Sequence, residues 1–342
     1  MKTVSAGKKR LKWSGILLTL LIVAILLVSV DIGKAMDMYS RISGKALCLS
    51  VVIYYLTMIL RTLRFNWLLN QGTGKTISPG QLLPIVLVHQ FYNRVLPFRT
   101  GEASYVVLLK TVCQYDVSSG ISTLLVARIY DALTVMVIFL IGLSFFAGKY
   151  HFAESYLLAF GFILFLLLIL WKLPFMVNKS RIMLSKIGNY FFRNKENGKK
   201  WVFRMNKSMK AIEKDVSLIN RFRSVFWLTL SSLGIWTGLF GMFYMFMYSC
   251  RLIPMSLDAF WQVITAATLS IYTFVLPINV ISGPMEASWA VGFIMVGIDK
   301  DAALASGFGI NWLSHLAITV LALPSMFFIG KQTEFFGKNW SR

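Results

Sequence analysis

The sequence predicts an all-α polytopic membrane protein, with about six full spans and two broken re-entrant hairpins that form an inverted repeat. Hydrophobic residues make up 57% of the 342 positions and charged residues only 14%, whereas about a quarter of the residues in a soluble domain are charged. Apolar runs also cover most of the chain. We therefore expect residues 1–342 to form one integral membrane domain, a helical bundle in lipid with no separate soluble catalytic domain.

Six apolar runs are long enough to cross a bilayer. A helix rises about 1.5 Å per residue, so about 20 residues span about 30 Å of hydrocarbon. The first run follows a basic cluster, as a signal peptide would, but no small-residue cleavage site follows it, which predicts a retained signal-anchor span. The runs lie at 13–30, 46–60 with its flanks, 120–147, 154–176, 225–249 and 302–330.

Two further apolar segments, 80–112 and 258–298, are each interrupted in the middle. The interruptions read VLPFRTGEAS at 95–104 and VLPINVISGPMEAS at 275–288, so both place Pro and Gly ahead of Glu-Ala-Ser. A re-entrant hairpin at each place keeps the orientation of the later spans, and the two hairpins then enter from opposite faces. A kinked ordinary helix at each place is the alternative. Gly/Pro-interrupted segments at matching positions in two halves are typical of a transporter binding site.

The two expected halves, 13–176 and 225–330, are joined by a basic segment over 177–224. Apolar residues recur in this segment at spacings of three and four, with Lys and Arg on the other faces, which predicts an amphipathic basic helix. Such a helix would lie on the anionic inner leaflet, although a solvated connector is the alternative. The recurring apolar positions are Met205, Met209, Ile212, Val216 and Ile219.

The positive charge of the chain predicts its orientation. The formal net charge is +21, with five basic residues ahead of the first run and fourteen, against three acidic ones, over 172–224. Because Lys and Arg are enriched in cytoplasmic loops, we expect a multi-pass protein of the cell membrane with both termini in the cytoplasm. The charge lies in loops between apolar runs, so nucleic acid is not an expected partner.

No arrangement typical of a metal site or an enzyme is found in the sequence. Cys48, Cys113 and Cys250 lie in or beside apolar runs and lack metal-ligand spacing, so we expect reduced thiols that pack. The histidines are equally scattered, and no metallohydrolase motif, nucleotide loop or Ser-His-Asp order occurs. We therefore predict no metal, no cofactor and no catalytic residue.

Ionisable side chains inside the apolar segments are the candidate functional residues. Each costs about 2.5 to 3.5 kcal/mol at the bilayer centre, so each needs a partner or a role. Arg128 and Asp131 are three residues apart on a helix and can pair, either for structure or as part of a polar lining. The candidates are Arg94, Arg99, Glu102, Arg128, Asp131 and Glu286, with His89 and His315 as further titratable groups.

The first interruption has the composition of an anion site. Pro and Gly end one half-helix and start another, so Glu102 falls in the first turn of the second half-helix. The helix dipole favours a carboxylate at that position. Glu286 has the same relation to Gly283 and Pro284 in the second interruption. Capping does not explain Arg94 and Arg99. Together with Asn93 and a half-helix N-terminus, these arginines would bind an anion, and the abundant anion in a membrane is a lipid phosphate.

Four motifs in order resemble the flippase-like membrane region of the lysylphosphatidylglycerol synthases. They are LRTLRFNWLL (60–69), NRVLPFRTGEAS (93–104), ARIYDAL (127–133) and VLPINVISGPMEAS (275–288), and the resemblance covers nearly the whole chain. Three positions depart from the family pattern, Tyr105, Ala127 and Met285, and a site with fewer charges would suit a different headgroup. The resemblance implies roles for Arg61, Arg64, Asn93, Pro97, Arg99, Gly101, Glu102, Arg128, Asp131, Gly283 and Glu286.

The resemblance implies a lipid-handling function. Full-length members carry a soluble domain that transfers an aminoacyl group to phosphatidylglycerol, and the membrane region is associated with moving the product between leaflets. We expect this chain to bind and translocate an anionic or aminoacylated phospholipid such as lysyl-phosphatidylglycerol, without intrinsic transferase activity. The alternatives are a membrane subunit that presents lipid to a separate aminoacyl- or glycosyltransferase, and a structural scaffold. The sequence leaves open a homo-oligomer and a transferase partner.

Overall fold

The described part of the chain is built of helices joined by short turns and loops. The computed structural model describes residues 32–72, 76–96, 101–146, 153–191, 202–203, 205–210, 212–213, 222–273 and 284–340. Within these ranges no strand occurs. Apolar side chains that face away from the protein, such as Val52, Leu56 and Ile59, leave a surface suited to lipid. The chain is an all-α polytopic membrane protein, as predicted.

Among the described residues, four long helices are apolar enough to cross a membrane. They are α3 (Gly44–Gly72), α6 (Val117–Phe146), α9 (Phe222–Ser249) and α12 (Lys300–Trp340). Each coincides with a predicted span. The predicted span 13–30 lies outside the described residues. The predicted span 154–176 lies within the long helix α7 (Ala153–Phe191), and its crossing of the membrane stays a prediction.

Each predicted broken segment forms a pair of short helices. The first pair is α4 (Pro79–Val95) and α5 (Gly101–Val112), and the second is α10 (Leu257–Thr273) and α11 (Pro284–Met295). At 12 or 17 residues these helices are about 18 to 26 Å long, shorter than the hydrocarbon layer of about 30 Å. Because the two helices of each pair also pack on each other, each pair is a hairpin rather than one kinked span.

Local sequence explains where the hairpin helices begin. Ser78 accepts a hydrogen bond from the backbone N–H of Gln81, whose side chain accepts one from the backbone of Ser78, and Pro79 occupies the first helical position of α4. In the second hairpin, Pro284 is the first residue of α11. Its partner helix α10 is joined to α11 by the hydroxyls of Ser270 and Ser288, each donating to the other's carbonyl at 3.0 and 2.9 Å.

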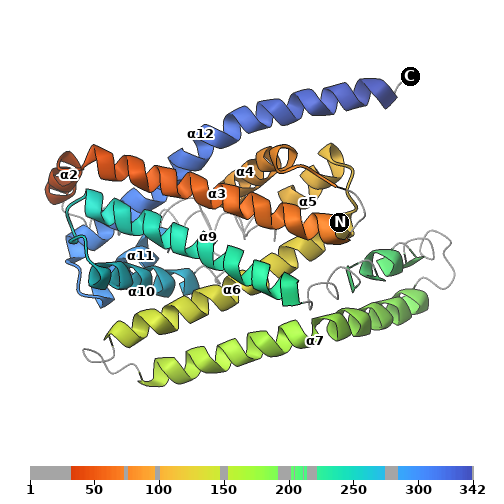
Figure 1. Cartoon of the computed structure of the whole chain (residues 1–342), viewed down its shortest axis with the longest axis horizontal. Helices are drawn as coiled ribbons and strands as arrows, with labels where there is room; N and C mark the ends of the chain where they lie inside the picture. Colours follow the sequence, from red (N-terminus) through yellow and green to blue (C-terminus); the bar gives the residue numbers. More distant parts are fainter. Residues whose placement is uncertain are drawn as a thin grey trace, which may run out of the picture.

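The two halves repeat one order of elements, long, short, short, long, and they pack as an inverted pair. Helices α3 and α9 lie side by side and run in opposite directions (Figure 1). Hairpin α4–α5 lies at one end of the bundle and hairpin α10–α11 at the other (Figure 1). Each hairpin also packs on the last long helix of the opposite half, α4 on α12 and α10 on α6.

The remaining elements lie at the edges of this core. Helix α2 (Ile32–Ser40) is attached to α12, because the Tyr39 hydroxyl donates to the carbonyl of Ala305 at 2.6 Å. In the basic segment 177–224, α7 continues to Phe191 and residues 205–210 are helical. Of the predicted apolar face, Met209 and Ile212 pack against the bundle. This face therefore contacts protein at those two positions, and its location on the membrane surface stays a prediction.

Candidate functional site

The first hairpin is closed by an unusually close approach of α5 to α4. A side chain on Gly101, the first residue of α5, would collide with the backbone of Asn93 and Tyr92. Glycine is therefore required here by space. The carbonyl of Gly101 accepts hydrogen bonds from His89 Nδ1 at 3.2 Å and from Ser104 Oγ at 2.5 Å. These contacts place the N-terminus of α5, and with it Glu102, beside His89 of α4 and Arg128 of α6.

A buried ion pair joins α3 to α6. Arg64 donates through both terminal nitrogens to Asp131, at 2.5 Å to Oδ1 and 3.1 Å to Oδ2. Its side chain is 0% exposed and that of Asp131 is 5% exposed. Arg64 also donates to Ser232 Oγ of α9 at 2.7 Å. This two-bonded geometry matches the planar guanidinium to the carboxylate, so it holds three long helices in register.

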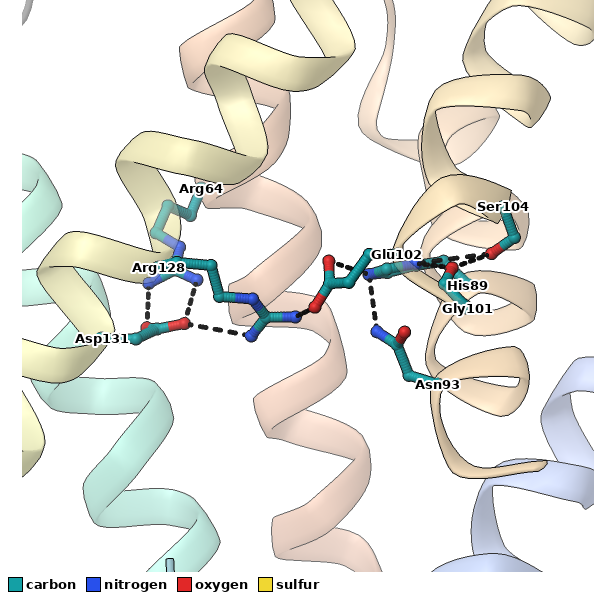
Figure 2. A network of polar contacts seen from close by, with 8 residues as sticks. All are labelled: Arg64, His89, Asn93, Gly101, Glu102, Ser104, Arg128 and Asp131. Carbon is teal, nitrogen blue, oxygen red and sulfur yellow. Dashed lines mark hydrogen bonds and ion pairs between the residues drawn. The ribbon is translucent and has the colours of Figure 1, made fainter. Parts of the chain in front are cut away.

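A second, more open ion pair joins α6 to the hairpin. Arg128 donates to Glu102 Oε1, and its other terminal nitrogen lies 3.7 Å from Asp131 Oδ2. The Arg128 side chain is 39% exposed and that of Glu102 is 29% exposed. Figure 2 shows the resulting chain of contacts from Arg64 through Asp131, Arg128 and Glu102 to the hairpin. We call this chain, with Arg61, the arginine–carboxylate network.

Arg61 gives the network an excess of positive charge. It is buried on α3, and the charges of Asp131, Arg64 and Arg128 all act on it. Its Nε is buried without a hydrogen-bond partner. Three arginines thus face two carboxylates, Glu102 and Asp131, which leaves one positive charge in excess among these five side chains. An uncompensated buried charge is costly, so the network is suited to an anionic ligand.

The other predicted site residues lie around or away from the network. Asn93 donates to His89 Nε2 at 3.1 Å and belongs to the first hairpin. Arg94 is half-buried in the last turn of α4, and its charge acts on His315 of α12. Arg99 lies outside the described residues. Glu286 is fully buried in the first turn of α11, where it accepts a hydrogen bond from Asn311 of α12 at 2.7 Å.

The structure also adds to the site Ser104 and Ser232, which the sequence did not single out, and His89, which the sequence offered only as a further titratable group. His89, Ser104 and Ser232 contact the predicted residues directly. The spacing of His89 and Asn93, four residues apart on one helix, could have indicated the first of these contacts. The pairing of Arg64 with Asp131 joins residues 67 positions apart, and no local pattern reveals such a contact. Among the described residues, no group of His, Cys, Asp or Glu could hold a metal ion.

Comparison with known proteins places the chain in a family. Part of it is similar to the Glycosyltransferase AglD of Haloferax volcanii, with 27% identity over 122 residues, which is 36% of this chain and 19% of that protein. The match thus spans about a fifth of that relative's length. No solved structure matches the chain. The family described as the lysylphosphatidylglycerol synthase TM region matches residues 13–322, so the chain belongs to that family.

Proposed function

We propose that this protein binds an anionic or aminoacylated phospholipid, such as lysyl-phosphatidylglycerol, by its headgroup and moves it between the leaflets. The observation that carries this proposal is the arginine–carboxylate network, which has an excess positive charge and lies beside a broken helix. Membership of a membrane family of lipid modification supports it.

The excess charge favours a phosphate diester as the group that is bound. Such a diester carries one negative charge, which equals the excess that Arg61 contributes. Arginine recognises phosphate oxygens through its fork of N–H donors, and the free N–H groups at the start of α5 add a further anion-binding element. Phosphatidylglycerol and its aminoacylated derivative share this diester.

The two ion pairs have different roles in this proposal. Arg64 and Asp131 are buried and doubly hydrogen-bonded, so they hold the helices. Arg128 and Glu102 are partly exposed, so an incoming headgroup can reach them. The phosphate would pair with Arg128, and the released Glu102 could accept hydrogen bonds from the amino groups of a lysyl headgroup.

The architecture is suited to translocation. Exposed apolar residues on the long helices allow the acyl chains to remain in the bilayer while the headgroup crosses through protein. Broken helices from two inverted halves are the arrangement in which one half rocks against the other around a central site. By the positive-inside bias of the loops, we propose that both termini are cytoplasmic and that the protein resides in the cell membrane.

The test is lipid exchange in liposomes that contain the purified protein. Fluorescent phosphatidylglycerol and lysyl-phosphatidylglycerol are reconstituted, and an impermeant quencher reports which leaflet each label occupies. Glu102→Gln and Arg128→Gln should abolish exchange while the helical content remains. The matched control is Lys110→Gln, which removes an exposed charge from the last turn of the same helix as Glu102 and should exchange lipid normally. Equal exchange in all variants would contradict the proposal.

A second candidate function is presentation of lipid to a separate transferase. The similarity of part of the chain to a glycosyltransferase favours this candidate. It predicts that the protein binds lipid but does not exchange it, and that the substitutions at Glu102 and Arg128 reduce the product of the partner enzyme. Well-folded protein that binds lipid without exchanging it would favour this candidate over transport.

A further inference from the structure

We propose that His89 and Glu102 form a proton-binding site, which takes up one proton when an anion occupies Arg128. Anion binding and proton uptake would then be coupled. This inference rests on the proposed function, because the anion is the lipid headgroup. It adds a coupling ion, and it follows from the hydrogen bonds around the His89 ring.

The ring of His89 has one fixed proton and one open position. The ring is fully buried on α4, and its Nδ1 lies 3.2 Å from the carbonyl of Gly101. A carbonyl can only accept, so Nδ1 carries the proton. In the neutral ring Nε2 is then an acceptor, and it accepts a hydrogen bond from the amide of Asn93 at 3.1 Å. A second proton could therefore bind only at Nε2.

Two buried acceptors without partners lie around that nitrogen. Glu102 Oε2 is 3.8 Å from Nε2, which is too long for a hydrogen bond, and it has no hydrogen-bond partner. Asn93 Oδ1 is also buried without a partner. A proton at Nε2 would turn that nitrogen into a donor. Glu102 could then accept a hydrogen bond from Nε2 if its Oε2 moved slightly closer. Alternatively, Asn93 could accept that hydrogen bond if its side-chain amide flipped so that Oδ1 faced Nε2. The protonated ring therefore satisfies an acceptor that the neutral ring leaves unpaired.

Charged groups on the neighbouring helices link this proton to the anion. The titratable and charged groups that face His89 are Glu102 and Tyr105 of α5, Arg128 of α6 and Arg61 of α3. Both arginines repel a proton on the ring, whereas Glu102 attracts one. In the unliganded site Glu102 is neutralised by Arg128 through Oε1, so little attraction remains for a second cation.

An anion on Arg128 changes this balance. The anion competes with Glu102 for the guanidinium and screens the arginine charge from His89. Glu102 is then left without its cation and attracts a proton to the His89–Glu102 pair. The step is balanced: a hydronium ion or buffer acid in solution loses its bond to the proton, an N–H bond forms at Nε2, and no other covalent bond changes. The anion first cancels the excess positive charge of the network, so the proton joins a site that no longer repels it as strongly.

The experiment is titration calorimetry of the purified full chain in detergent with a short-chain phosphatidylglycerol, in two buffers of different ionisation enthalpy. The difference in heat gives the protons taken up per anion bound. We expect the wild type to take up about one proton per anion bound. At pH values where the free His89–Glu102 pair has already lost this proton, the affinity for the anion should fall by about tenfold for each unit of rising pH. His89→Asn keeps a donor for Gly101 but cannot be protonated, so its uptake should fall to zero. His315→Asn, which removes a half-buried imidazole of α12, should leave the uptake unchanged.

The outcomes separate this inference from the proposed function. Anion binding by the wild type without proton uptake between about pH 5 and 8, where an imidazole titrates, would overturn the coupling and leave lipid binding intact. No binding at any pH would overturn the proposed function and the coupling with it. Because the wild type alone gives the proton count, a His89→Asn variant that failed to fold would not prevent a decision. Uptake that persists in folded His89→Asn would overturn the assignment to His89.

Discussion

Substitution of Asp131 by Asn should destabilise the protein far more than substitution of Glu102 by Gln. Both changes remove one negative charge and conserve shape. Asp131, however, accepts two hydrogen bonds from Arg64, and the two side chains are 5% and 0% exposed. The Asn amide would direct a donor at the guanidinium and leave Arg64 as an uncompensated buried cation. Breaking a buried pair in this way costs about 3 to 5 kcal/mol.

Substitution of Glu102 by Gln should lower the free energy of unfolding only slightly. Its partner Arg128 is 39% exposed and Glu102 itself is 29% exposed, so solvent screens the charge that remains, and pairs of this kind contribute about 0 to 1 kcal/mol. The two variants should therefore differ by at least about 2 kcal/mol in free energy of unfolding. Removing both charges of the buried pair, with Arg64→Met and Asp131→Leu together, should restore much of the lost stability because Arg64 is no longer left as a buried cation without its carboxylate.

Equilibrium unfolding in mixed micelles with increasing sodium dodecyl sulfate, followed by circular dichroism, measures these free energies. The three variants are compared with the wild type under one detergent condition. Equal free energies of unfolding for Asp131→Asn and Glu102→Gln would refute the reasoning, because the division of the network into a structural pair and an exchangeable pair would then fail. A double variant less stable than Asp131→Asn would refute the argument from the lone buried charge.

Three further substitutions and one control, Gly80→Ala, test the packing of the two hairpins. Gly101→Ala should push α5 away from α4, cost about 1 to 3 kcal/mol of stability and abolish lipid exchange, whereas Gly80→Ala, where nothing lies within 4 Å of the added carbon, should do neither. Ser270→Ala removes a hydrogen bond between α10 and α11 and should lower the free energy of unfolding by about 0.5 to 1.5 kcal/mol. Asn311→Ala removes a donor to the buried carboxylate of Glu286 and should lower the free energy of unfolding by more, about 1.5 to 3 kcal/mol. The same unfolding measurement ranks Ser270→Ala and Asn311→Ala, and the reverse order would contradict the argument.

The sequence predicts the fold of this protein well, because hydropathy and helix-breaking residues act locally. Long apolar runs identify α3, α6, α9 and α12, since the bilayer requires that length. The two Pro/Gly interruptions identify the hairpins, and the first-turn positions of Glu102 and Glu286 follow from the preference of carboxylates for helix N-termini.

The partners within the site are much less predictable. The spacing of Arg128 and Asp131 predicts a pair, and these groups do lie 3.7 Å apart. Their shortest contacts, however, are with Glu102 and Arg64, which come from other helices. Such contacts depend on how distant helices pack, and helix periodicity carries no information about them. The sequence offered His89 only as a further titratable group, because its contacts depend on the return of α5 against the last turns of α4.

The most direct test of the central claim is whether the protein prefers phosphatidylglycerol to phosphatidylcholine, which has the same phosphate diester but adds a choline cation that cannot donate a hydrogen bond to Glu102. The exchange rates of fluorescent phosphatidylglycerol and of zwitterionic phosphatidylcholine are measured in the same liposomes, for the wild type and for Arg61→Gln, which removes the excess positive charge of the network. The account predicts faster exchange of phosphatidylglycerol by the wild type and loss of that preference in folded Arg61→Gln. Equal rates for the two lipids in the wild type, or an unchanged preference in Arg61→Gln, would contradict it.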